Sequence, residues 1–327
     1  MTGVEIQAVI ESPTKRPSLR ARIAFQLVRA VVKGWPRNDS AALVRRARRV
    51  FGQPGWLRFM QTRGVAIEEI PGDIAGEWLT PEKFCSYDPV LLYLHGGGYV
   101  SCSPQTHRPI TTALARLLGW RVFSLAYRLA PEHPFPAALD DAVNCYHWLV
   151  AAGFKAEHIA VAGDSAGGGL AMAMMVRLRD ERSPLPACAA CLSPWVDLTD
   201  ESQPTNTDSC AMFVAEDGPA FAKVYLNGAA AKSSLASPLY ADLTRLPPLL
   251  VQVSSTEMLF DDSQRLHDKA VACGVESKLH IYPNVPHVWQ MFAGVMPEAD
   301  QALREIADFI TAKIGSIQSA AKLESTS

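Results

Sequence analysis

Residues 159–175, IAVAGDSAGGGLAMAMM, hold the pattern that decides the fold. A short apolar run typical of a buried strand leads into GDSAG at residues 163–167, and a run rich in alanine and methionine, typical of a helix, follows. A G-x-S-x-G sequence between a strand and a helix predicts a sharp turn that lifts the serine oxygen above the sheet. Gly163 and Gly167 leave room where the two backbones approach closely. We therefore expect Ser165 to be a nucleophile at the carboxyl end of a strand.

The segments on either side of this turn show the same alternation. From about residue 65, short apolar runs alternate with helical stretches of ten or more residues. Strands are predicted at VAIEEI, GEWLT, PVLLYL, WRVFSLAY, HIAVAGDS, PACAACLSPW, PPLLVQVSS and ESKLHIYP, the first two of them at a sheet edge. This order predicts an α/β fold with a mostly parallel central sheet and helices on both faces.

Two stretches depart from this rhythm. The first sixty residues predict two amphipathic helices. One face of the first helix consists of Leu19, Ile23, Gln26, Leu27, Ala30 and Val31. Residues 200–232 are too long for a simple connection and predict an insertion that folds over the carboxyl ends of the strands. The expected organisation is N-terminal helices at 1–50, a core at 51–199 and 233–316, an insertion at 200–232 and a tail at 317–327.

Composition narrows the class of protein. The chain has 327 residues, a net charge of −2 and a pI of about 6.5, which predict no long-range attraction to nucleic acid or to an anionic membrane. The N-terminus lacks the pattern of a secretory signal, and no apolar run reaches spanning length, so we expect a cytoplasmic protein without stable membrane insertion.

Seven scattered cysteines indicate reduced thiols, and Cys188 and Cys191 are expected to be small buried residues of a strand. No metal-ligand spacing is present, and we expect neither a metal nor an organic cofactor.

The sequence His95-Gly96-Gly97-Gly98 adds a second element upstream of Ser165. Acyl transfer passes through a tetrahedral oxyanion, which fixed N–H donors stabilise. Glycines let backbone amides turn toward that point. We predict an oxyanion hole made by the amides of Gly97, Gly98 and Ala166, the last being the residue after the nucleophile.

His287 is the histidine best placed to act as general base, because it follows the last predicted strand on a loop downstream of Ser165. The chain order serine, acid, histidine requires a carboxylate between them at the end of a strand. Glu257, after PPLLVQVSST, meets this requirement and is the predicted acid. The rival carboxylates are Asp197, Asp261 and Asp262.

Four motifs in this order resemble the bacterial hormone-sensitive-lipase family of esterases. They are HGGGY at 95–99, YRLAPEHPFPAAL at 127–139, GDSAGG at 163–168 and HVWQMF at 287–292. The resemblance implies an α/β-hydrolase core, a helical cap formed by the N-terminal helices at 1–50 and the insertion at 200–232, and a Ser–acid–His triad. It also implies activity on short acyl esters and a possible homodimer through the last strand. The family's acid motif usually reads D-x-L-x-D-E, whereas residues 257–262 here read EMLFDD, so that Glu257 takes the acid's place by register.

We therefore expect a serine carboxylesterase acting on a small-molecule ester. The predicted substrate pocket includes Tyr99, Trp195, Phe213 and Met258. Two alternatives stay open at this level: an amidase or lactonase with the same triad, and a non-catalytic binding protein like the plant gibberellin receptors. Those receptors lack the catalytic histidine, and His287 is present here.

Overall fold

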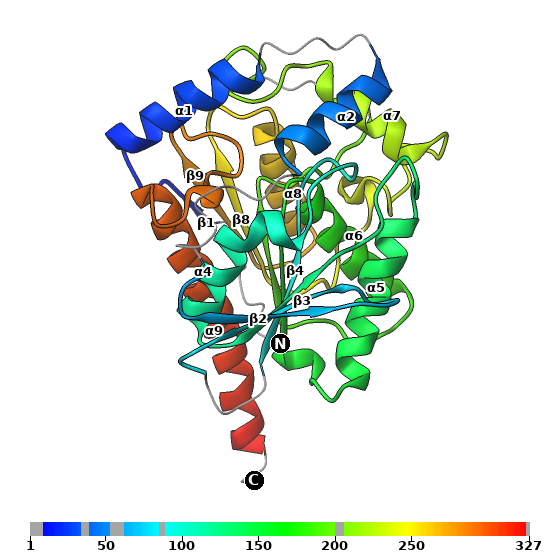
Figure 1. Ribbon diagram of the computed structural model, residues 1–327. Helices are drawn as coiled ribbons and strands as arrows, with labels where there is room; N and C mark the ends of the chain where they lie inside the picture. Colours follow the sequence, from blue (N-terminus) through cyan, green and yellow to red (C-terminus); the bar gives the residue numbers. More distant parts are fainter. Residues whose placement is uncertain (1–8, 34–38, 53–61, 85–88, 200–205, 325–327) are drawn as a thin grey trace.

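The computed structural model describes residues 9–33, 39–52, 62–84, 89–199 and 206–324 (Figure 1). Within these ranges one sheet of nine strands has the order β1-β9-β8-β7-β6-β4-β5-β3-β2. The strands are β1 (Val9–Glu11), β2 (Val65–Ile70), β3 (Gly76–Pro81), β4 (Val90–Leu94), β5 (Arg121–Leu125), β6 (Ile159–Asp164), β7 (Cys188–Leu192), β8 (Leu249–Ser254) and β9 (Ser277–Tyr282). In this order, each pair of neighbouring strands from β1 as far as β5 is parallel. Strand β3 pairs antiparallel with both β5 and β2. The predicted α/β fold with a mostly parallel sheet is confirmed.

Helices cover both faces of the sheet (Figure 1). They are α1 (Leu19–Val32), α2 (Ser40–Val50), α4 (Arg108–Leu118), α5 (Ala137–Ala151), α6 (Ala166–Asp180), α7 (Asp217–Leu226), α8 (Phe260–Ala272) and α9 (Pro297–Glu324). One apolar core contains side chains of α5, α6 and α8, and a second core on the other face contains those of α4 and α9. Side chains of β4 alternate between the two cores, which is why this strand is apolar at every position.

The N-terminal stretch differs from its prediction in one place. Residues Val9–Glu11, expected to belong to the cap, form β1 and pair in parallel with β9. Three residues are too short to show a period, and this strand is defined by its partner. Because β1 covers the outer edge of β9 at residues 278–280, it occupies part of the edge where the family resemblance implied a homodimer contact. The homodimer stays a prediction.

Two further predictions were wrong in their details. The stretch GEWLT was expected at a sheet edge, but β3 lies between β5 and β2. Its Glu77 is fully buried and forms an ion pair of 2.7 Å with Arg108 of α4, a contact that sequence cannot reveal. At the C-terminus, α9 continues to Glu324, past residue 317 where a tail was predicted.

No helix in the described part of the chain has the length and apolar character needed to cross a membrane.

Helices α1, α2 and α7 lie together at one end of the molecule (Figure 1). Leu27 of α1, Val50 of α2 and Phe221 of α7 line the same cavity as Ser165, so these helices stand over the carboxyl ends of the strands. The first six residues of the predicted insertion, 200–205, lie outside the described residues, and the cap boundaries stay a prediction.

Glycines at 163 and 167 bring α6 close to the sheet. A Cβ atom on Gly167 would lie 2.0 Å from the backbone oxygen of Leu94, and one on Gly163 would lie 2.4 Å from the backbone oxygen of Gly167. Both distances are far shorter than a carbon and an oxygen atom that are not bonded can approach, so both positions require glycine for the sharp turn between β6 and α6.

We expect Gly167→Ala to lower the free energy of unfolding by about 2 kcal/mol or more, because the new methyl group meets backbone that cannot move aside. The matched control is Gly315→Ala in α9, where no described residue outside the neighbouring helix backbone comes within 4 Å of the added Cβ. That change should be neutral or stabilising by up to about 1 kcal/mol. Urea denaturation of the three proteins measures both effects, and equal stability of Gly167→Ala and wild type would contradict this account.

Candidate active site

Ser165 occupies a strained turn between β6 and α6. Its φ of 52° and ψ of −121° lie outside the regions that non-glycine residues prefer. Backbone hydrogen bonds hold the turn: the Ser165 amide donates to the Leu192 carbonyl at 2.8 Å, and the Ser165 carbonyl accepts from the amides of Gly169 (3.1 Å) and Trp195 (2.9 Å). The side chain faces the cavity that the cap helices border. This is the turn that the G-x-S-x-G pattern predicts.

His287 and Glu257 meet at the same end of the sheet. His287 follows β9, Glu257 follows β8, and the Nδ1 atom of His287 forms a hydrogen bond with Oε2 of Glu257. The other oxygen of Glu257 accepts from Ser193 Oγ at 2.7 Å and from the Ser254 amide at 2.6 Å. These contacts fix the carboxylate, which in turn orients the imidazole.

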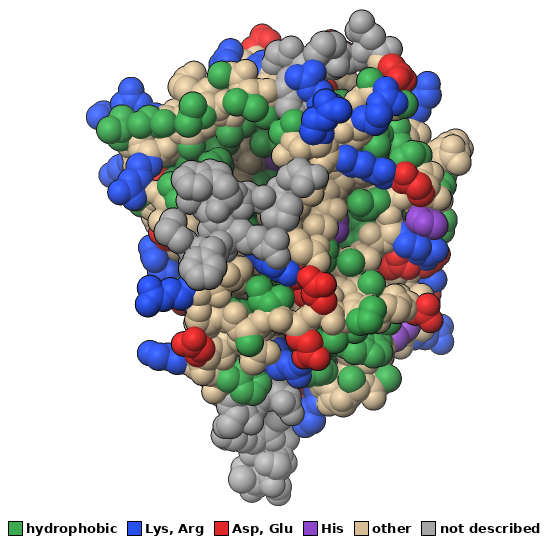
Figure 2. All heavy atoms as spheres, in the orientation of Figure 1, with side chains coloured by type: hydrophobic (Ala, Val, Ile, Leu, Met, Phe, Trp, Pro, Cys, Tyr) green, Lys and Arg blue, Asp and Glu red, His purple; other side chains and the backbone are tan. Residues whose placement is uncertain are grey.

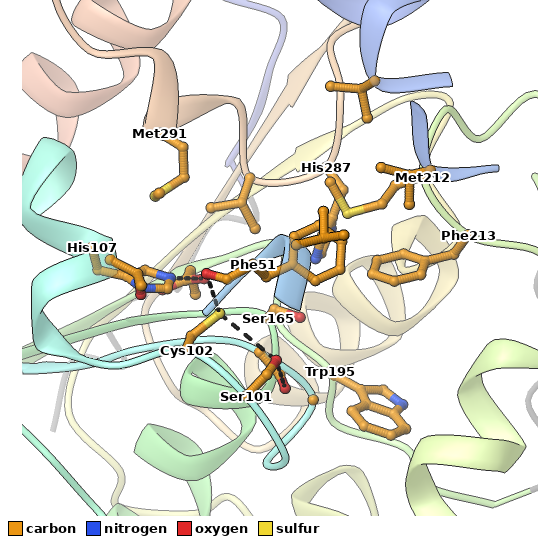
Figure 3. Close-up of a pocket in the computed structure, with 18 of the residues that line it drawn as sticks. Phe51, Ser101, Cys102, His107, Ser165, Trp195, Met212, Phe213, His287 and Met291 are labelled. Carbon is orange, nitrogen blue, oxygen red and sulfur yellow. Dashed lines mark hydrogen bonds and ion pairs between the residues drawn. The ribbon is translucent and has the colours of Figure 1, made fainter. Parts of the chain in front are cut away.

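The second ring nitrogen of His287 faces a different environment. Its Nε2 atom is buried and has no hydrogen-bond partner among the described residues. His287 lines the cavity together with Ser165, and Figure 3 shows the two side chains bordering it. An imidazole held at Nδ1 by a carboxylate, with Nε2 free to take up a proton, has the arrangement of a general base.

The rival carboxylates have other partners. Asp197 accepts hydrogen bonds from Thr199, Tyr240 and Arg265. Asp262 accepts from the amides of Val196 and Asp197, at 2.9 and 3.0 Å, and Asp261 lies 3.4 Å from Arg265. Of the four candidate acids, Glu257 is the carboxylate that contacts His287.

The glycine loop after β4 lies beside Ser165. Gly97 and Gly98 have φ values of 110° and 63°, a region that favours glycine, and both line the cavity. A Cβ atom on Gly97 would lie 2.3 Å from the Ser101 carbonyl oxygen. Ala166 begins α6, and the first amides of a helix have no acceptor within it. The three predicted oxyanion donors therefore belong to the two segments that flank the serine.

Asp164 joins these two segments. Its carboxylate accepts from the Tyr93 hydroxyl at 2.7 Å and from the Gly96 amide at 3.0 Å, and it lies 3.2 Å from Nε2 of His107. Burial alone raises the pKa of Asp164, but the interaction with His107 and the hydrogen bonds from His107 and Tyr93 outweigh it, and the pKa is lowered. Asp164 thus remains ionised and supports the turn through hydrogen bonds.

A cavity of about 720 Å³ opens above Ser165. Three of the predicted pocket residues, Trp195, Phe213 and Met258, line it, and the Phe213 ring lies edge-on to His287 with centroids 5.2 Å apart. Tyr99, the fourth, is absent from the described lining. Its ring is buried and stacks on the ring of Tyr225, with centroids 3.7 Å apart.

Sequence reasoning missed most of the apolar wall. The additional apolar residues on the cavity include Leu27, Val28, Val32, Phe51, Met212, Phe221, Met291 and Phe292. They come from α1, α7, the short 3₁₀ helix Trp289–Phe292 and connecting segments, and Figure 3 shows Phe51, Met212 and Met291 around the opening. The apolar period of α1 was visible in the sequence, and the family resemblance implied a cap from the N-terminal helices, but nothing there indicated which side chains of α1 line the cavity.

Within the described ranges, His, Cys, Asp and Glu side chains form no group of three that could hold a metal ion. The described cysteines are free thiols, and Cys188 and Cys191 are buried in β7 as predicted. Cys85 lies outside the described residues.

The strained serine turn on a mostly parallel sheet defines an α/β hydrolase, and comparison with known proteins gives the family. A family model for the alpha/beta hydrolase fold matches residues 91–291. An acetyl-hydrolase of Streptomyces hygroscopicus is 40% identical over 253 residues, covering 75% of this chain and 84% of that protein. Carboxylesterase/phospholipase LipF of Mycobacterium tuberculosis is 38% identical over 232 residues, covering 68% of this chain and 61% of that protein.

Solved structures agree. An esterase from the bacterial hormone-sensitive lipase family superposes with a TM-score of 0.81 at 40% identity, covering 91% of this chain and 99% of that one. EstE5, solved after soaking with p-nitrophenyl butyrate, gives a TM-score of 0.82 at 36% identity, with the same coverage. The chain belongs to the bacterial hormone-sensitive-lipase family of esterases and is a carboxylic ester hydrolase.

The buried Asp262 predicts a pH-dependent stability. Burial, together with the nearby Asp197 carboxylate, raises the pKa of the Asp262 carboxyl to about 7, whereas the pKa of an aspartate in the unfolded chain is about 3.9. The folded state therefore holds the proton more tightly. The contribution of Asp262 to the free energy of unfolding is complete below about pH 4 and is lost as the pH rises through 7. The loss is at most about 1.4 kcal/mol per pH unit.

We expect wild type to lose stability between about pH 4 and pH 7 relative to Asp262→Asn, which keeps an acceptor oxygen for the two amides but cannot titrate. Urea denaturation at several pH values measures the difference between the two proteins. Parallel stability profiles would show that Asp262 does not titrate in this range.

Proposed function

We propose that this esterase hydrolyses short- to medium-chain acyl esters through Ser165, His287 and Glu257. The observation that carries the proposal is the arrangement of His287, which binds Glu257 through Nδ1 and leaves a buried Nε2 without a partner among the described residues, on the cavity that Ser165 faces. A non-catalytic binding protein has no need of an ionisable group held in this way.

In the proposed mechanism, Nε2 of His287 takes the proton of Ser165 as its oxygen attacks the ester carbonyl. The imidazolium then donates this proton to the departing alcohol, and an acyl-enzyme remains on Ser165. Water attacks the acyl group in the second half of the reaction, again with His287 as base. Glu257 keeps the imidazole in the required tautomer and stabilises its cationic form.

The negative charge that develops on the carbonyl oxygen requires donors already in place. The amides of Gly97, Gly98 and Ala166 are the proposed donors, because they belong to the two segments beside Ser165. Asp164 supports this geometry by holding the Gly96 amide and by belonging to the strand that carries the serine. Fixed donors stabilise the transition state without reorganisation at the moment of reaction.

The cavity supports an apolar acyl or alcohol group. Aromatic and sulfur-bearing side chains such as Trp195, Phe213 and Met258 line it, and its volume of about 720 Å³ is of the size that takes small organic ligands. A relative of known structure was soaked with p-nitrophenyl butyrate, which makes p-nitrophenyl esters the natural probes for this chain.

The triad is tested by three variants assayed on p-nitrophenyl butyrate. We expect Ser165→Ala to lower kcat by about a thousandfold or more, and Glu257→Gln to lower it by about a hundred- to ten-thousandfold, since the amide can favour the wrong tautomer of His287. Asp197→Asn serves as the matched control, because its carboxylate contacts Arg265 instead of His287. Circular dichroism checks that each variant is folded.

Loss of activity in folded Asp197→Asn with full activity in Glu257→Gln would assign the acid to Asp197. A matched p-nitroanilide distinguishes the amidase alternative, because an esterase should cleave the ester far faster. Equal or faster cleavage of the anilide would overturn the esterase proposal.

Gly218 offers a test of the acyl site. It lines the cavity at the start of α7, and a Cβ atom there would lie 3.7 Å from the end of the Met258 side chain, with no other described residue outside its own helix within 4 Å. We expect Gly218→Leu to fill part of the cavity and to lower kcat/KM for the octanoyl ester at least fivefold more than for the acetyl ester (about 1 kcal/mol). An equal effect on both esters would place the acyl chain elsewhere.

A further inference from the structure

Helix α1 carries an unusual arrangement of side chains. Its large aliphatic residues at every fourth position are 51–69% exposed: Leu19, Ile23, Leu27 and Val31. Its buried side chains are small: Ala21, Ala24 and Val32. The apolar face predicted from the sequence is present, but it points outward. Surface helices usually turn such a face toward the core, so a continuous exposed row indicates a contact outside the molecule.

This exposure is fixed by anchors at both ends of α1. The Ser18 amide and hydroxyl donate to the carboxylate of Glu298 at 2.5 and 2.9 Å. At the other end, Nζ of Lys33 donates to three carbonyl oxygens in residues 207–210. The helix is thus held in place with its aliphatic row facing solvent.

Basic side chains lie at the end of this row and on helix α2. The first fifty residues hold 11 of the 31 lysines and arginines in the chain but 3 of its 33 acidic residues. Exposed arginines on α1 and α2 are Arg20, Arg22, Arg29, Arg45 and Arg49. Figure 2 shows the green row along α1 with blue side chains at its end and over α2. We call these five arginines and the four aliphatic residues the α1–α2 face. The net charge of −2 for the whole chain gives no sign of this local concentration of positive charge.

The α1–α2 face is continuous with the mouth of the cavity. Leu27 belongs to the exposed row and also lines the cavity. Val50 and Val295, which are 38% and 42% exposed, line it too, and Arg20 of α1 donates to the Val295 carbonyl at 3.1 Å. An apolar molecule that leaves this face can therefore enter the cavity along an apolar path.

We propose that the α1–α2 face docks the enzyme reversibly on an anionic lipid surface. A helix with exposed aliphatic residues flanked by arginines lies in the plane of a lipid–water interface, where the apolar row enters the acyl boundary and the arginines meet anionic headgroups. A second copy of the chain fits less well, because a two-fold contact would bring the same arginines against one another. Docking would place the cavity mouth at the lipid surface.

The test is flotation with vesicles of phosphatidylcholine containing about a third phosphatidylglycerol, a composition that supplies the negative surface. The protein carries Ser165→Ala, so that binding is measured without hydrolysis and independently of the proposed function. We expect Leu19→Gln with Ile23→Gln to lower the partition coefficient at least tenfold. Neither residue is among the described lining of the cavity, and both side chains are already exposed.

The matched control is Leu117→Gln at the end of α4, shortly before β5 begins and therefore at the amino ends of the parallel strands, away from α1; its side chain is 44% exposed. This change should leave vesicle binding unaltered. Vesicles of phosphatidylcholine alone, or high salt, should weaken binding of the protein with an intact α1. With Ser165 present, the double variant should hydrolyse soluble p-nitrophenyl acetate at the wild-type rate.

Failure of the protein with an intact α1 to bind anionic vesicles would overturn the proposal, as would equal binding by the double variant. Light scattering gives an independent check. A dimer that the double variant converts to monomers would assign the α1–α2 face to a second copy of the chain and would also overturn lipid docking.

Discussion

Ser165 is held at φ 52° where β6 meets α6, and glycine on either side lets the two backbones approach to distances that no side chain permits. This turn fixes where the rest of the site must be. Leu192 at the end of β7 and Trp195 in the loop that follows form hydrogen bonds with its backbone, and Asp164 connects it to the glycine loop after β4. The strain is stabilised by parallel strands covered on both faces, so the core of the fold supports the geometry of the nucleophile.

Local patterns predicted the parts of the structure that depend on neighbours in the chain. The strand, turn and helix around Ser165 follow from apolar period and glycine placement, and Glu257 was selected because it directly follows a predicted strand. What could not be predicted depends on residues far apart. The hydroxyl of Ser193 reaches Glu257 from another strand, and Val9–Glu11 form a strand because β9 lies beside them. Tyr99 was predicted in the pocket, but its ring stacks on Tyr225, a partner that is more than a hundred residues away in the chain.

Average properties of the chain were the least informative. A net charge near zero indicated no attraction to anionic surfaces, yet the basic residues are concentrated in the N-terminal helices, next to an exposed aliphatic row. The same helices contribute Leu27, Val28 and Val32 to the cavity wall. Substrate access and surface recognition therefore depend on one element, and that element lies outside the α/β core that carries the proposed catalytic groups.

The most direct test of the central claim is covalent labelling by phenylmethylsulfonyl fluoride, followed by peptide mass spectrometry. An activated serine attacks the sulfonyl fluoride, whereas ordinary serines do not. The account predicts one stoichiometric adduct on the peptide that contains Ser165, with loss of ester hydrolysis in proportion to labelling. An adduct on another residue that abolishes hydrolysis, with Ser165 unmodified, would contradict it.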